Sequence, residues 1–148
     1  MNESQFTQSI NKQIKNEVYV WKINCNFAKG VPDAYYSGDK ADLWVEYKYL
    51  QSTPKRSKII PNLSRLQQKW LTRAKKQGRN VAVVVGTPDG CYVLKEENEW
   101  HNGVIPNSDN VLHKKEVARW IESITCRGED NHVKRKPKKS TCQTIDSS

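Results

Sequence analysis

Residues 30–50 read GVPDAYYSGDKADLWVEYKYL and decide the expected architecture. The segment Ser-Gly-Asp-Lys at positions 37–40 has the composition of a tight turn, and aromatic and β-branched residues that favour strands flank it. We therefore predict a β-hairpin. Side chains alternate between the two faces of a strand, so Trp44, Glu46 and Lys48 of the returning strand share one face. Its other face is apolar.

A hairpin loop with an even number of residues would place Asp33 on the same face as Glu46 and Lys48, whatever the register. Glu46 and Lys48 would then lie roughly 6.6 Å apart along the strand, with Asp33 opposite or diagonal to Glu46. Two neighbouring carboxylates repel unless a cation lies between them, and hard oxygen ligands select Mg²⁺ or Mn²⁺. Such an ion polarises a phosphodiester and activates water, while Lys48 orients the water or stabilises developing charge. These residues predict phosphodiester hydrolysis.

The rest of the chain predicts a mixed β-sheet flanked by helices, an α/β fold. Helices are expected at residues 3–16, 62–77 and 111–124, and strands at 18–24, 31–36, 42–50, 81–85 and 91–94. Asn62 or Ser64 can cap the second helix, whose buried stripe would be Leu63, Leu66, Trp70 and Ala74. The strand–helix–strand order around this helix predicts parallel pairing through a right-handed crossover.

The residues of the hairpin resemble the PD-(D/E)xK nuclease superfamily. Pro32-Asp33 matches its first half-motif and Glu46-Tyr47-Lys48 its second. With Gln67 three residues before Trp70-Leu71, and a strand of valines after a glycine, the wider pattern resembles the VRR-NUC branch of viral and repair nucleases. The resemblance covers about residues 3–85. It implies a restriction-endonuclease-like core with the order helix, three strands, helix, strand (αβββαβ).

The resemblance also implies a role for each matching residue. Asp33 and Glu46 would hold Mg²⁺, with Mn²⁺ as a substitute, and Lys48 would be the catalytic cation. Further expected contributors are Glu3 as an auxiliary acid, with Glu17 as the alternative, Gln67 as a supporting polar residue, and the backbone carbonyl of Tyr47 as another metal ligand.

Charge favours a polyanionic partner. The 148 residues include 25 lysines and arginines against 16 aspartates and glutamates, a formal net charge of +9. Candidate DNA contacts are Lys55, Arg56 and Lys58 of a basic loop and Arg65, Lys69 and Arg73 of the following helix. The alternative for these cations is ordinary solubilising charge.

Domain organisation and compartment follow from composition. We predict one domain over residues 1–126 and a basic, disordered tail over residues 127–148, which contains KRKPKK. The longest apolar run, at positions 81–85, is five residues, whereas a membrane-spanning helix needs about 20. Without a secretory signal pattern, we expect a soluble protein of the cytoplasm, or of the host cytoplasm if viral. The four cysteines form no C-x-x-C pair and are expected to be free thiols.

The sequence therefore predicts a Mg²⁺-dependent DNA endonuclease, of phage or mobile-element type, that cuts structured or branched DNA or a specific duplex. Because one such site cuts one strand, a homodimer or higher homo-oligomer is expected. Two alternatives are a nucleic-acid-binding module that has kept the fold without cleavage and a homing endonuclease with a long recognition site. The plainest alternative for Glu46 and Lys48 is an ion pair on a solvated strand.

Overall fold

The computed structural model of the chain describes residues 1–23 and 29–128. The predicted tail lies outside the described residues apart from its first two positions, as do Cys25 and Cys142. Cys91 and Cys126, the cysteines within the described part, are free thiols as expected. Among the described residues, no helix has both the length and the apolar character needed to cross a membrane.

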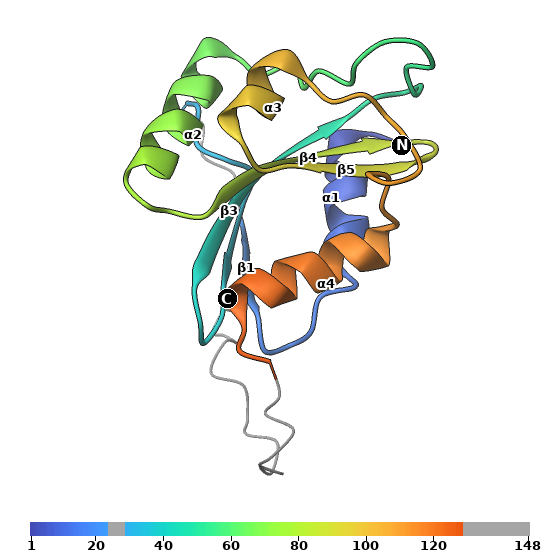
Figure 1. Cartoon of the computed structure of the whole chain (residues 1–148). Helices are drawn as coiled ribbons and strands as arrows, with labels where there is room; N and C mark the ends of the chain where they lie inside the picture. Colours follow the sequence, from blue (N-terminus) through green and yellow to red (C-terminus); the bar gives the residue numbers. More distant parts are fainter. Residues whose placement is uncertain (24–28, 129–148) are drawn as a thin grey trace.

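A five-stranded mixed sheet with the order β1-β2-β3-β4-β5 forms the centre of the fold (Figure 1). The strands are β1 (Tyr19–Lys22), β2 (Ala34–Ser37), β3 (Asp42–Tyr49), β4 (Val81–Thr87) and β5 (Gly90–Leu94). β3 and β4 pair in parallel, and the other neighbours pair antiparallel. The predicted mixed sheet and the parallel pairing across the second helix are confirmed.

Helices cover both faces of the sheet (Figure 1). They are α1 (Glu3–Asn11), α2 (Arg65–Lys76), α3 (Glu97–Asn102) and α4 (Lys114–Thr125). α1 and α4 pack on one face through Phe6 and Ile121, against Tyr47. α2 and α3 pack on the other face through Leu71 and Trp100. The order α1-β1-β2-β3-α2-β4 is the predicted αβββαβ core, which β5, α3 and α4 extend.

The β2–β3 hairpin forms where the turn composition predicts it. Ser37 pairs with Asp42 and Ala34 with Val45, so residues 38–41 form a loop with an even number of residues. The loop is held at the end of α4, because the Thr125 carbonyl accepts hydrogen bonds from the Lys40 and Ala41 amides. Helix-terminal carbonyls have no partner within their own helix, so this contact satisfies one of them.

Three sequence expectations need correction. The first helix ends at Asn11 rather than near position 16, because the amides of Gln13 and Ile14 bond three residues back and tighten the turn. The buried stripe of α2 is rotated relative to the prediction. Leu66 was expected to be buried but is 49% exposed, and Leu71 is buried instead. α3 was not among the predicted helices. It is short and polar, so it shows no hydrophobic period.

Candidate active site

Asp33, Glu46 and Lys48 lie on one face of the sheet, as the alternation predicts. Continuing the β2–β3 register by one pair beyond Ala34 and Val45 places Asp33 opposite Glu46. An oxygen of the Asp33 carboxylate, Oδ2, accepts a hydrogen bond of 2.9 Å from the backbone amide of Tyr47. This bond turns the Asp33 side chain toward β3. The structure therefore brings together the two acids and the lysine that the sequence singled out.

Glu46 is the most unusual group of this cluster, because only 2% of the residue is exposed. Lys48 Nζ lies 3.7 Å from Glu46 Oε2, close enough for an ion pair but too far for a hydrogen bond. The alternative of an ion pair on a solvated strand is therefore wrong for Glu46. Burial, followed by the negative charge of Asp33, raises the pKa of Glu46 from 4.5 to about 8, against the opposing effect of Lys48.

Gln67 holds one oxygen of Glu46 from the first turn of α2. Ser64 is the N-cap of α2, its hydroxyl accepts from the Gln67 amide, and the Gln67 Oε1 accepts from the Ser64 amide at 2.9 Å. With its oxygen engaged, the Gln67 side chain directs Nε2 at Glu46 Oε2, again at 2.9 Å. Local capping thus positions the side chain that the sequence named as a supporting residue.

The other oxygen of Glu46 lacks a partner. Oε1 is buried and accepts no hydrogen bond from any described residue. A buried carboxylate oxygen without a partner costs free energy unless a proton or a cation reaches it. Two facing carboxylates beside a strand backbone are also the hard oxygen donors that Mg²⁺ prefers. The residues present therefore fit a divalent cation.

Glu3 and Glu17 do not complete a three-acid site. Within residues 1–23 and 29–128, no group of three or more His, Cys, Asp or Glu side chains is placed to hold a metal ion. Glu3, in the first turn of α1, adds the smallest of the effects that raise the pKa of Glu46. Glu17 is exposed and precedes the end of β1 that pairs with Ser37, whereas Asp33 lies beyond the other end.

The six candidate DNA-binding cations are all exposed. Within the described part of the chain, none of them forms an ion pair. Those residues are Lys55, Arg56, Lys58, Arg65, Lys69 and Arg73. Their charges are therefore available to a polyanion.

The sequence analysis missed a row of aromatic side chains on the same face. The row crosses three strands and ends on α2: Trp21, Tyr35, Trp44 and Trp70. Successive ring centroids lie 6.3, 4.6 and 5.2 Å apart. Strand alternation already indicated that Trp44 shares a face with Glu46. The pairing of β1 with β2 was needed to align Trp21 and Tyr35 with it.

Comparison with known proteins finds similar solved structures but no similar sequence family. No family model and no curated protein sequence matches the chain. The chain is similar to the solved structure of Hjc from Archaeoglobus fulgidus, described as a Holliday junction resolvase from an archaeal hyperthermophile. The two share 17% sequence identity over 80% of this chain and 98% of that chain, with a TM-score of 0.49. The function therefore has to be inferred from the site itself.

Proposed function

We propose that the protein is a Mg²⁺-dependent DNA endonuclease of the PD-(D/E)xK type, closest to the VRR-NUC branch and encoded by a phage or mobile element. The observation that carries the proposal is the unpartnered, buried Oε1 of Glu46, which lies in a carboxylate facing Asp33 and beside Lys48. A charge arrangement that is unfavourable without a cation is expected where a cation belongs to the working site.

Each residue has a distinct part in this proposal. Asp33 and Glu46 would hold the ion, with the Tyr47 carbonyl as a further oxygen ligand, and Gln67 would keep the Glu46 carboxylate in place. Bound Mg²⁺ would supply polarisation of the phosphodiester and a more acidic water. Lys48 is partly open to solvent, with 16% of its side chain exposed, so its ammonium group can meet the phosphate that reaches the site.

The substrate in this proposal is structured or branched DNA, or a specific duplex. The exposed cations of the loop before α2 and of α2 itself would contact its phosphates. Cleavage of both strands, or of two arms of a junction, needs two such sites, so we propose that the protein acts as a homodimer or higher oligomer.

Nicking of supercoiled plasmid with and without Mg²⁺ tests the proposal. We expect nicking by the wild type only when Mg²⁺ is present, and loss of nicking in Asp33→Asn and Lys48→Ala. Lys115→Ala, which removes an exposed charge on α4, serves as the control and should nick normally. Parallel assays on linear, nicked, single-stranded and four-way DNA would give the substrate preference. Nicking that survives both site substitutions would refute the assignment.

A second candidate is a DNA-binding module of the same fold without cleavage. The observation in its favour is that the described residues contain no three-acid group able to hold a metal. This candidate predicts that the wild type and both site variants bind DNA equally, and that none of them nicks in Mg²⁺ or Mn²⁺.

A further inference from the structure

We propose that the aromatic pocket around Trp44, two residues before Glu46 on β3, binds an unpaired nucleotide of the DNA strand. This inference rests on the proposed function and narrows it to substrates that carry single-stranded or displaced nucleotides next to the cut. The proposal is based on three features that lie at one face of the sheet. They are an open aromatic surface, the exposed Arg79, and the carboxylates of Asp33 and Glu46.

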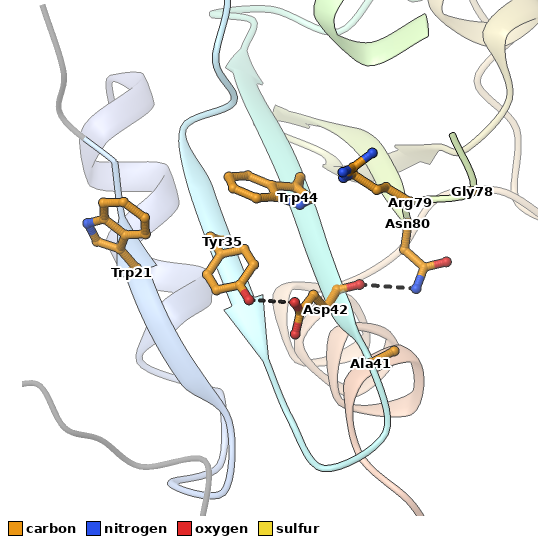
Figure 2. A pocket seen from close by; sticks show the side chains of 8 residues that line it. All are labelled: Trp21, Tyr35, Ala41, Asp42, Trp44, Gly78, Arg79 and Asn80. Carbon is orange, nitrogen blue, oxygen red and sulfur yellow. Dashed lines mark hydrogen bonds between the residues drawn. The ribbon is translucent and has the colours of Figure 1, made fainter. Parts of the chain in front are cut away.

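The pocket has a volume of about 570 Å³, within the range typical of ligand sites. The residues that line it are Trp21, Tyr35, Ala41, Asp42, Trp44, Gly78, Arg79 and Asn80 (Figure 2). Figure 2 shows Trp21, Tyr35 and Trp44 on three adjacent strands. Trp21 is 50% exposed, although burial of an indole is strongly favourable. A half-exposed indole at the end of an aromatic row leaves a flat apolar surface for a planar ligand.

The polar groups around the pocket suit a nucleotide. Arg79 is exposed and forms no ion pair within the described residues. One of its nitrogens donates to Gln77, which leaves further N–H donors of the guanidinium for a phosphate. The two oxygens of Asp42 accept from the Tyr35 and Ser37 hydroxyls, so hydrogen bonds already satisfy the one acid of the pocket.

Only part of this face is covered by helices. Trp70 of α2 contacts Trp44, and the opposite flank of α2 contacts the N-terminal end of α3 through Lys75 and Thr72. Arg73, three residues after Trp70, therefore lies on the flank of α2 that borders the uncovered strands β1 and β2. Arg73 is exposed and can approach the same strand of DNA as Arg79.

An unpaired nucleotide fits this surface better than a base pair does. In a duplex both faces of a base are stacked, so an aromatic surface cannot contact them without extrusion of the base. Aromatic platforms flanked by cations are the general means of binding single strands. Trp44 precedes Glu46 by two residues, roughly 6.6 Å along β3.

Anisotropy of a labelled oligothymidylate, and of the same strand annealed to its complement, tests the inference with the full chain in EDTA. We expect Trp21→Ala to weaken single-strand binding by between about 5-fold and about 100-fold, and duplex binding by less than about twofold. Trp21→Phe should retain most of the single-strand affinity. The matched control is Ile105→Ala, which removes an apolar side chain that is 63% exposed outside the pocket.

Arg79→Ala provides a second measurement. It should flatten the salt dependence of single-strand binding by about 0.7 units of slope if one phosphate contact is lost. Lys115→Ala, which removes the same charge on α4, should leave the slope unchanged. Equal losses on single strand and duplex in Trp21→Ala, or no loss on either, would overturn the inference.

The two proposals fail separately. If Trp21→Ala selectively loses affinity for single-stranded DNA but the wild type never nicks plasmid, the nucleotide-binding pocket stands and the nuclease proposal is refuted. If the wild type nicks plasmid only in Mg²⁺ and Trp21→Ala binds single-stranded DNA as tightly as the wild type does, the nuclease proposal stands and the nucleotide-binding pocket is refuted.

Discussion

Replacing Glu46 by Gln should stabilise the metal-free protein, and the gain should grow with pH. The substitution removes the charge and preserves the shape of the side chain. The variant amide oxygen can still accept the hydrogen bond from Gln67. The buried Oε1, which has no partner in the described structure, is then replaced by a neutral group.

The magnitude follows from the pKa of Glu46, which burial and Asp33 raise from 4.5 to about 8. Between these two values the folded protein keeps a proton that the unfolded chain has lost. Raising the pH therefore destabilises the wild type by about 1.4 kcal/mol per pH unit, and the loss levels off above pH 8. Between pH 4.5 and pH 8, the difference in the free energy of unfolding between Glu46→Gln and wild type should therefore grow to on the order of 5 kcal/mol.

Urea unfolding in EDTA at about pH 5.5, about pH 7 and about pH 9 measures this difference. Mg²⁺ should then stabilise the wild type by about 2.7 kcal/mol at a hundredfold excess over its dissociation constant, and Glu46→Gln by much less. The control is Glu17→Gln, an exposed position, where stability should change by less than about 0.5 kcal/mol at each pH.

If the difference in unfolding free energy between Glu46→Gln and wild type stays constant with pH, the pKa of Glu46 is not raised in the folded protein and the reasoning is refuted. Equal stabilisation of both proteins by Mg²⁺ would refute Glu46 as a metal ligand.

Three further perturbations test other contacts. Gln67→Ala should lower Mg²⁺ affinity by about 10- to 100-fold, measured by calorimetry, whereas Ser64→Ala, which removes only the cap, should lower it less. The loop before α2 carries three exposed cations, Lys55, Arg56 and Lys58. Their joint neutralisation should reduce the salt slope of duplex binding by up to about 0.9 per lost phosphate contact, and an unchanged slope would assign them to solubility. Gly38→Ala should lower Tm, because the new Cβ would lie 2.3 Å from the Thr125 carbonyl oxygen; an unchanged Tm would contradict that close packing.

Patterns within short stretches of sequence were enough to predict the three central residues of the site. Turn composition and strand alternation were enough to place Asp33, Glu46 and Lys48 on one face, because the side-chain period of a strand does not depend on the rest of the fold. The cap at Ser64 was one of two predicted positions for the start of α2, and it also positions Gln67. Local patterns failed where the signal was short, as in α3, or where packing chose the buried side, as with Leu66.

The properties that make the site chemically unusual depend on contacts between distant segments. No local pattern shows that Glu46 is almost fully buried, because its burial requires α2 to close over β3 through a separation of about twenty residues, the span of the Gln67 contact. The row from Trp21 to Trp70 likewise needs three strands and a helix in register. The sequence by itself determined which groups share a face. The tertiary structure alone decided which of them lose water, because desolvation depends on what packs above a residue.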